Sequence, residues 1–331
     1  MLILDDFGCH VYKKHKRLVV VNKKAGYKKE VALKKLRTVL VLTRLSLTSE
    51  LLKELADNGI TVLLAGYLGR PVAKIQGARV GGTPANRKLQ YEALKNYRSV
   101  ELVKELIKAK IENQLTNIKY YAKSKRIYGS AEVHEIIHKI LALIDRLLTI
   151  SCPEGIEKVR QEILNIEGLA ANEYFSFLAK LYGGLLGFTG RDQEGKDMFN
   201  LLLNVGYNLL ALWTWNFVDH FSLDAFEGFL HVERPGRLSL VYDLMEPLRP
   251  FVDRFVLSFM LQRQLHGELP EKRKYEEVAQ FKKYFVQCLL DYRVQYGRRK
   301  VSLRHALFLE IESVVSFLQG KGRIYTPRLV W

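Results

Sequence analysis

The periodicity of the apolar residues changes once along this chain, near residue 85, and this change limits the fold more than any other feature. Before it, short β-branched runs alternate with turns rich in Asn, Gly and Lys. These runs include residues 17–21, 38–42, 60–64 and 72–75. After the Gly-Gly-Thr-Pro sequence at 81–84, apolar residues recur every three or four positions almost to the C-terminus. We therefore predict an α+β chain, with a β-rich N-terminal domain (residues 1–84) and a larger all-α domain (residues 85–331).

One helix is predicted inside the β-rich part. Thr48 precedes the amphipathic run Ser49–Asp57, and Glu50 lies in its first turn. The pair Asn58-Gly59 ends this run, and residues 60–64 follow as a buried strand.

The net charge narrows the choice of partner. The 331 residues include 52 Lys and Arg against 35 Asp and Glu, which gives a formal charge of +17. A polyanion relieves the mutual repulsion of such an excess, so nucleic acid is the leading candidate. A membrane surface would attract the same charge. However, the longest apolar run, Leu209–Val218, contains Thr214 and Asn216 and is much shorter than the ~20 residues of a spanning helix.

The N-terminus and the cysteines indicate the compartment. Residues 1–8 carry Asp5 and Asp6 where a secretory signal would carry positive charge, so we expect a soluble, cytoplasmic protein. Cys9, Cys152 and Cys288 are odd in number and far apart, which predicts reduced packing residues without a disulfide framework or thiolate zinc site.

Two basic clusters are candidate phosphate contacts. The first lies within residues 1–37, where the only acidic residues are Asp5, Asp6 and Glu30. Its members are Lys13, Lys14, Lys16, Arg17, Lys23, Lys24, Lys28, Lys29, Lys34, Lys35 and Arg37. Lysines on strand edges also prevent edge-to-edge aggregation, and for any single Lys we favour that interpretation. The second cluster comprises Arg293, Arg298, Arg299 and Lys300, interleaved with Tyr292 and Tyr296. These tyrosines either stack on unpaired bases or, more commonly, serve in packing.

Glu167 is a carboxylate at the edge of a buried helical face. It lies four residues after Ile163 and three before Ala170, within an apolar stripe that runs from Val159 to Leu181. A carboxylate there requires a cation, a metal or hydrogen-bond donors. Gly168 weakens a helix by about 1 kcal/mol and suggests space for a ligand or another backbone. Taken alone, this position favours a buried salt bridge.

A second group of polar residues lies near the middle of the helical part. His231 ends an apolar run before the basic turn Arg234-Pro235-Gly236-Arg237. A helix entered from Ser239 then places Asp243 and Glu246 three residues apart on one face, and Pro247 and Pro250 bend or end it. Taken singly, a lone His is usually a core or surface residue, and such acidic pairs are usually solvated.

Together, Glu167, His231 and Glu246 supply the mixed oxygen and nitrogen ligands that suit Mg²⁺ or Mn²⁺. Asp243 is a candidate outer or water-mediated ligand. A hard divalent ion suits phosphodiester chemistry, because it polarises a phosphoryl oxygen and activates a hydroxyl or water.

Several segments resemble the CRISPR adaptation integrases. GFLHVERPGRLSLVYDLMEPLRPFVDRFV (residues 228–256) is similar to that family's signature block, and IEGLAANEYF and FNLLLNVGYNLL are similar to its two preceding blocks. AKIENQ (residues 109–114) resembles the segment at the start of the family's helical domain. The residues before the His motif, Phe221–Glu227, depart from the family because they lack its usual Gly and Pro. The first 45 residues match only loosely.

The resemblance implies a β-rich domain for homodimerisation and a helical domain that carries the site. The family's metal ligands fall on Glu167, His231 and Glu246, and its accessory acidic position falls on Asp243. The family works as a dimer of dimers around a small ferredoxin-like companion protein. Its active sites join the 3′-hydroxyl ends of captured double-stranded DNA to the repeat array.

The resulting hypothesis is a metal-dependent DNA endonuclease and integrase that also acts on branched DNA. Arg191, Arg234 and Arg237 would neutralise the DNA backbone, and the second basic cluster would contact DNA through Arg298, Arg299 and Lys300. Two alternatives stay open. One is a DNA-binding scaffold whose carboxylates only form salt bridges, and the other is a repair nuclease that uses water as its nucleophile.

Overall fold

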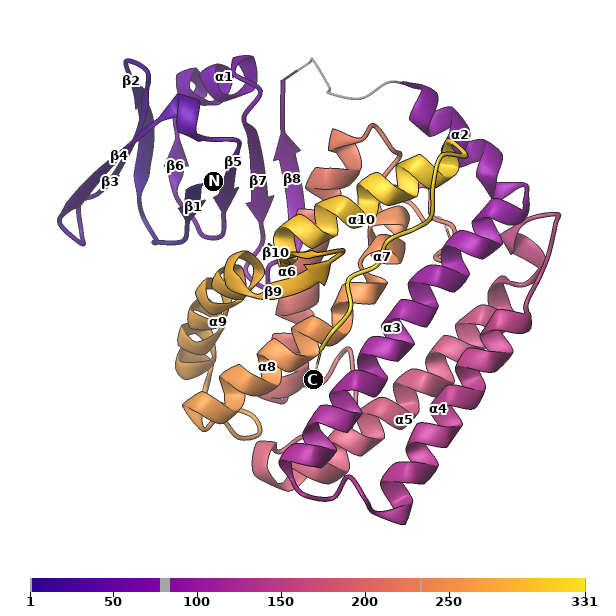
Figure 1. Cartoon of the computed structure of the whole chain (residues 1–331). Helices are drawn as coiled ribbons and strands as arrows, with labels where there is room; N and C mark the ends of the chain where they lie inside the picture. Colours follow the sequence, from indigo (N-terminus) through magenta and orange to yellow (C-terminus); the bar gives the residue numbers. More distant parts are fainter. Residues whose placement is uncertain (1, 78–83, 233, 331) are drawn as a thin grey trace.

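A computed structural model describes residues 2–77, 84–232 and 234–330 of the chain. The predicted α+β class is confirmed, because the strands precede a predominantly helical part (Figure 1). Gly81, Gly82 and Thr83 of the predicted boundary lie outside the described residues, and the first long helical segment begins at Pro84. The N-terminal strands are β1 (Leu2–Leu4), β2 (His10–Lys14), β3 (Arg17–Asn22), β4 (Tyr27–Ala32), β5 (Thr38–Val41), β6 (Ser46–Leu47), β7 (Thr61–Ala65) and β8 (Pro71–Ile75).

These strands form two sheets. In the first, β1, β5 and β7 are parallel and β8 pairs antiparallel with β7. In the second, β2, β3 and β4 form an antiparallel meander and β6 pairs parallel with β2. The single predicted helix of this region is α1 (Ser49–Asp57). As predicted, Thr48 caps it, with its side chain accepting a hydrogen bond from the Leu51 amide, and Asn58 ends it.

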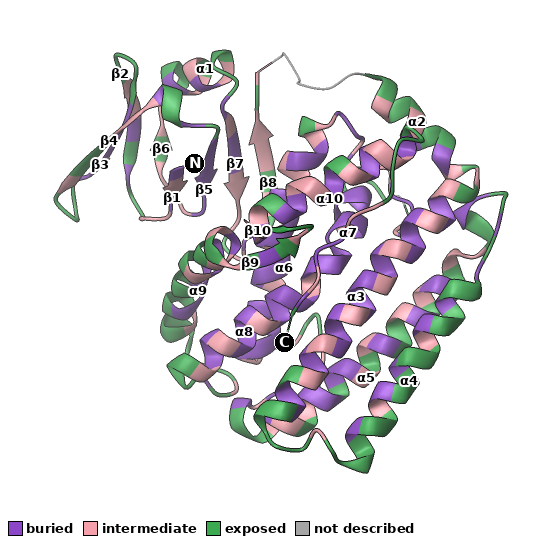
Figure 2. Ribbon diagram, viewed as in Figure 1, coloured by how far each residue is buried: buried purple, intermediate pink, exposed green. Residues whose placement is uncertain are grey.

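The remaining chain is built mainly from helices. Its α-helices are α2 (Pro84–Leu94), α3 (Tyr97–Ser124), α4 (Ala131–Thr149), α5 (Arg160–Leu186), α6 (Met198–His220), α7 (Ser239–Leu244), α8 (Arg249–Arg263), α9 (Glu271–Asp291) and α10 (Leu303–Leu318). Short 3₁₀ helices are η1 (Leu33–Lys35), η2 (Ile156–Lys158) and η3 (Glu246–Leu248). Helices α3, α4 and α5 pack side by side, and α6 lies at the centre of the helices, where most of its surface is buried (Figures 1 and 2).

The sheet that contains β5 and β7 is buried on both faces. Val39, Val41 and Val62 point into a core shared with α1 and the second sheet, whereas Leu40 and Leu63 pack into the core of the helices. Successive side chains of a strand point to opposite faces, so a nearly uninterrupted apolar strand such as β5 is suited to this position. The strand-rich part is thereby anchored on α6.

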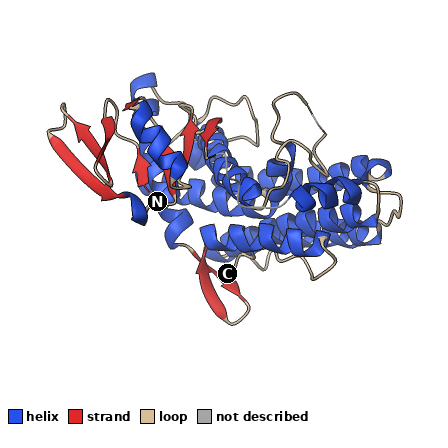
Figure 3. Ribbon diagram, turned by 90° about the horizontal axis from the view of Figure 1, so that it is seen from above, coloured by secondary structure: helices blue, strands red, loops and turns tan. Residues whose placement is uncertain are grey.

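The helical part also contains one hairpin, β9 (Arg293–Tyr296) and β10 (Arg299–Ser302), which the helical periodicity did not indicate. Figure 3 shows this hairpin projecting from the helices near the C-terminus. Arg298, Arg299 and Lys300 are exposed at its turn. Tyr292 packs on Phe251 and Phe255, and Tyr296 packs on Tyr325, as the packing interpretation expects.

Ion pairs account for part of the N-terminal basic cluster. Lys13 lies 2.8 Å from Glu54 of α1, and Lys28 and Arg17 flank Glu30 at 2.8 and 3.2 Å. These contacts agree with a structural role for these three residues. Among the described residues, no helix is long and apolar enough to cross a membrane. Cys9 and Cys152 are buried and Cys288 is partly buried, all as free thiols.

Gly206 sets how closely α6 approaches α8, and its replacement tests this packing. A Cβ atom at this position would lie 2.4 Å from Val252 Cγ1, which is buried. We expect Gly206→Ala to lower the free energy of unfolding by about 1–3 kcal/mol in urea titrations, because an overpacked core must shift. The matched change Gly184→Ala places its Cβ in open space and should be neutral or stabilising by up to about 1 kcal/mol. Equal stability of both variants would contradict the proposed packing.

Candidate active site

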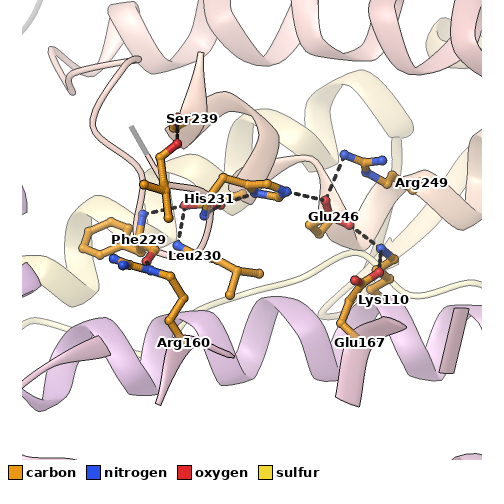
Figure 4. A network of polar contacts seen from close by, with 11 residues as sticks. Lys110, Arg160, Glu167, Phe229, Leu230, His231, Ser239, Glu246 and Arg249 are labelled. Atoms are coloured by element: carbon orange, nitrogen blue, oxygen red, sulfur yellow. Dashed lines mark hydrogen bonds and ion pairs between the residues drawn. The ribbon is translucent and has the colours of Figure 1, made fainter. Parts of the chain in front are cut away.

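The structure brings the three predicted metal ligands together from separate elements. Glu167 lies on α5, His231 lies in the loop before α7, and Glu246 begins η3. Figure 4 shows the His231 ring directed towards Glu246, with His231 Nε2 4.0 Å from Glu246 Oε1. The side chain of Glu246 is only 3% exposed, whereas those of Glu167 and His231 are 21% and 19% exposed. The site therefore combines one buried carboxylate, Glu246, with the partly exposed side chains of Glu167 and His231.

Lys110 of α3 links the two glutamates. Its ammonium forms an ion pair with Glu167 Oε1 and lies 2.6 Å from Glu246 Oε2 (Figure 4). Burial alone would lower the pKa of Lys110, but Glu167 and Glu246 together raise it above its ordinary value. The salt-bridge alternative for Glu167 is thus realised in this conformation. A Cβ atom at Gly168 would meet no described atom within 4 Å, so no described backbone packs there, and space for a ligand beside Glu167 stays a prediction.

Glu246 stays ionised despite its burial. Desolvation would raise its pKa, but Arg249, Lys110 and His231 outweigh this effect and lower the pKa to about 2. Arg249 Nη2 lies 2.9 Å from Glu246 Oε1, one helical turn along the chain. A buried carboxylate that is charged at neutral pH is a strong ligand for a cation.

Asp243 holds the loop that presents His231. Its carboxylate accepts hydrogen bonds from the amides of Phe229, Leu230 and His231 at 2.6–3.0 Å. Its Oδ1 also lies 2.6 Å from His231 Nδ1, on the far side of the ring from Glu246. With a proton on Nδ1, the His231 Nε2 lone pair faces Glu246, as a histidine ligand requires. Asp243 is thus a positioning residue beside the site.

Further contacts fix the same loop. The buried Gln90 side chain of α2 donates to the carbonyls of Asp224 and Glu227 and accepts from the Asp224 amide. Arg160 Nε donates to the Phe229 carbonyl at 3.3 Å. These side chains shape a segment that lacks the Gly and Pro of the resembling family. Helix α7 begins at Ser239 as expected. However, Ser239 is the first helical residue and Leu238 holds the N-cap position, while the Ser239 hydroxyl donates to the Val232 carbonyl.

The donor set fits a hard divalent cation. Two carboxylates and an imidazole nitrogen converge, and the Lys110 ammonium lies between the carboxylates as a monovalent stand-in. In this conformation, no three His, Cys, Asp or Glu side chains of the described residues are close enough to hold a metal ion. The residue types suit such an ion, and in this conformation the two carboxylates are paired with Lys110.

A network of polar and cation–π contacts around Tyr207 lies next to the site. Tyr207 of α6 donates a hydrogen bond to Asp253 of α8, and its ring contacts two guanidinium groups. The guanidinium carbon of Arg249 lies 4.9 Å from the ring centroid, and that of Arg191 lies 5.6 Å from it. Arg191 also donates to the side chains of Asn200 and Asn204. The predicted DNA contact Arg191 is thus linked to the site through the Tyr207 ring and Arg249, which pairs with Glu246.

The other predicted DNA contacts lie at different distances from the site. The Arg237 guanidinium is 5.7 Å from the Tyr242 ring centroid, which in turn is 6.2 Å from that of His231. Arg234 is exposed in the same loop. Arg298, Arg299 and Lys300 belong to the separate β9–β10 hairpin. The structure therefore associates Arg191 and Arg237 with the site and leaves the hairpin cluster as a distinct surface.

Sequence reasoning missed Lys110 and Arg249. Lys110 follows Leu106 and Ile107 by one helical turn, so a cation on an apolar stripe was the available signal. Arg249 follows Glu246 by three residues, a spacing at which helical side chains meet.

Comparison with known proteins places these features in a family context. Residues 2–279 match the family model described as CRISPR associated protein Cas1. A CRISPR-associated endonuclease Cas1 of Korarchaeum cryptofilum is 38% identical, covering 100% of this chain and 98% of its own length. One from Archaeoglobus fulgidus is 32% identical, covering 97% of each chain. A solved CAS1 protein from Thermotoga maritima has the same fold, with a TM-score of 0.74 at 19% identity, covering 98% of this chain and 99% of its own.

Asp253 should make stability depend on pH in a direction opposite to that of most carboxylates. Burial raises its pKa to about 6, despite the opposing effects of Tyr207 and Lys110. Between its ordinary pKa of 3.8 and about 6, the folded protein retains a proton that the unfolded chain releases. The contribution of Asp253 to the free energy of unfolding therefore falls as pH rises through that window and is constant above it. Relative to wild type, Asp253→Asn should gain on the order of 2 kcal/mol of unfolding free energy between pH 4 and 7.

Chemical denaturation at both pH values measures this difference. Asp57→Asn, which alters an exposed carboxyl group at the end of α1, is the matched control and should follow the wild type. If Asp253→Asn also follows the wild type, burial does not raise the pKa of Asp253.

Proposed function

Because the chain belongs to the Cas1 family of CRISPR-associated proteins, we propose that it is a divalent-metal-dependent DNA endonuclease and integrase of CRISPR adaptation. The observation that carries this proposal is the pairing of Glu167 and Glu246 through the buried Lys110, with His231 Nε2 on the other oxygen of Glu246 at 4.0 Å. The relatives named as CRISPR-associated endonucleases support the nuclease activity. The charge of +17 supports DNA as the substrate.

We propose that the ion is Mg²⁺ or Mn²⁺ and that Glu167, His231 Nε2 and Glu246 hold it. When bound, it would polarise a phosphoryl oxygen and lower the pKa of the attacking hydroxyl or water. Lys110 must leave the position between the carboxylates, because two cations cannot share it. Asp243 keeps the imidazole in the required tautomer.

The proposed reaction is transesterification. A 3′-hydroxyl of the captured DNA attacks a phosphodiester at the array repeat, so one phosphodiester forms as another breaks and the leaving strand takes a proton as its own 3′-hydroxyl. The bond count is unchanged, and ATP is not needed. Arg191, Arg234 and Arg237 would neutralise the charge of the DNA backbone near the site, and the hairpin residues Arg298, Arg299 and Lys300 would contact DNA further away. With water as the nucleophile, the same site would cleave double-stranded or branched DNA.

The proposed assembly follows the family. Residues 1–84 would mediate homodimerisation, and a small ferredoxin-like companion protein would join two dimers in the cytoplasm. Among the described residues, β1 and β8 are the edge strands of one sheet and β4 and β6 those of the other, and edge strands are common sites of pairing between chains.

Strand transfer of a labelled duplex with free 3′-hydroxyl ends into a repeat-containing plasmid tests this function. It is measured with and without Mn²⁺, with the companion protein if one is encoded nearby. We expect a joined product only when Mn²⁺ is present, and His231→Ala should reduce it by about 100-fold or more because a ligand is lost. The matched control His138→Ala changes an exposed histidine of α4 and should retain the activity.

Other outcomes favour the alternatives. DNA binding without cleavage or joining, despite Mn²⁺ and the companion, would support the scaffold. Cleavage of branched DNA without joining would support a repair nuclease. Full joining by His231→Ala would contradict the proposed site.

A further inference from the structure

A cavity of about 500 Å³ separates the strand-rich part from α6 and α10. Arg37, Gly59 and Lys74 line it on the sheet side, and Asp219 and Arg304 line it on the helix side. It contains none of the proposed metal ligands. Its size is within the range of about 300–1,000 Å³ that is common for small-molecule sites.

The walls of this cavity carry a net positive charge. Lys74 and Asp219 lie 2.6 Å apart, with side chains 5% and 18% exposed, so they neutralise each other. Arg37 and Arg304 form no ion pair with any carboxylate of the described residues. Two uncompensated guanidinium groups therefore line the cavity, together with His220 and His305. An anion is the ligand that this charge distribution favours.

The Arg304 side chain packs on aromatic rings, and no described carboxylate pairs with it. Its guanidinium carbon lies 5.4 Å from the Trp213 ring centroid and 5.5 Å from that of Phe217. Its Nε atom is buried and makes no hydrogen bond with any described residue. Burial lowers the pKa of Arg304, and no neighbouring carboxylate offsets this effect. A partly desolvated guanidinium group without a carboxylate partner is costly, and an anion bound in the cavity that Arg304 lines would compensate its charge.

Two further features suit a phosphate and an attached base. Arg304 belongs to the first turn of the 16-residue helix α10, where the helix dipole favours negative charge and the Ser302 side chain caps the His305 amide. Phe217 and Phe308 also line the cavity, with ring centroids 5.5 Å apart, and His305 stacks on Phe308. Guanidinium groups bind phosphate in bidentate geometry, and aromatic rings stack on bases.

We propose that this cavity is a nucleotide-binding site in which Arg37 and Arg304 bind the phosphate and the aromatic wall contacts the base. The nucleotide is either free or part of a DNA strand, and the recognising chemistry is the same for both. The proposal goes beyond the metal-dependent activity, because it uses none of that site's residues and needs no metal.

Binding measured in EDTA tests the proposal. One probe is dAMP, followed by calorimetry, and the other is a fluorescein-labelled, 5′-phosphorylated oligothymidylate of four nucleotides, followed by anisotropy. We expect Arg304→Gln and Arg37→Gln each to weaken binding by about tenfold, because each removes a charge-assisted hydrogen bond. Arg273→Gln removes an equal charge from an exposed position on α9 and should leave the affinity unchanged.

The pattern across the probes identifies the source of the ligand. A loss for dAMP indicates a free-nucleotide site, and a loss confined to the oligonucleotide indicates a nucleotide of a bound strand. The proposal is overturned if neither probe binds, or if all three variants bind alike. If Arg304→Gln does not fold, Arg37→Gln still tests whether the cavity binds the phosphate, because Arg37 lines the opposite wall. The strand-transfer experiment is independent of these outcomes, since it depends on metal.

Discussion

The ion pairs of Lys110 with Glu167 and Glu246 are the interaction on which the arrangement of the helices around the site depends. Lys110 and Glu246 are almost fully buried, and a buried charge that lost its partner would destabilise the fold by several kcal/mol. Helices α3 and α5 and the short helix η3 must therefore keep their relative positions. Arg249 and Asp243 extend the same constraint, because one compensates Glu246 and the other fixes the His231 loop. The fold thus keeps Glu167 and Glu246 close together through the ammonium group of Lys110.

A second constraint lies between the strands and the helices. The sheet with β5 and β7 is buried on both faces, and one of these faces packs on the helices. Separation of the strand-rich part from α6 would therefore expose apolar side chains of both the sheet and the helices. The Lys74–Asp219 ion pair crosses the same junction. The proposed nucleotide cavity lies along this junction, so a ligand there would contact both parts of the chain at once.

Much of this organisation could be predicted from the sequence. The change of period near residue 85 predicted the order of strands and helices, and the position of Glu167 on an apolar stripe indicated that it needs a cation, a metal or hydrogen-bond donors. The role of Lys110 was not predicted, because a lysine on a helix is usually solvated. Only the packing of α3 shows that the face carrying Lys110 is buried. The β9–β10 hairpin was also missed, because its four-residue strands are too short to interrupt a helical pattern clearly. The role of Asp243 depends on three backbone amides, which no residue spacing reveals.

The binding of Mn²⁺ to Lys110→Met tests most directly whether Lys110 occupies the cation position. Free Mn²⁺ is followed by electron paramagnetic resonance below the unfolding temperature of each protein. Lys108→Met, which removes a surface ion pair with Glu105 on the same helix, is the control. We predict that Lys110→Met lowers the Kd for Mn²⁺ by about tenfold or more, because the competing ammonium is gone while both carboxylates are retained. An unchanged or higher Kd would contradict the view that Lys110 and the metal ion compete for one position.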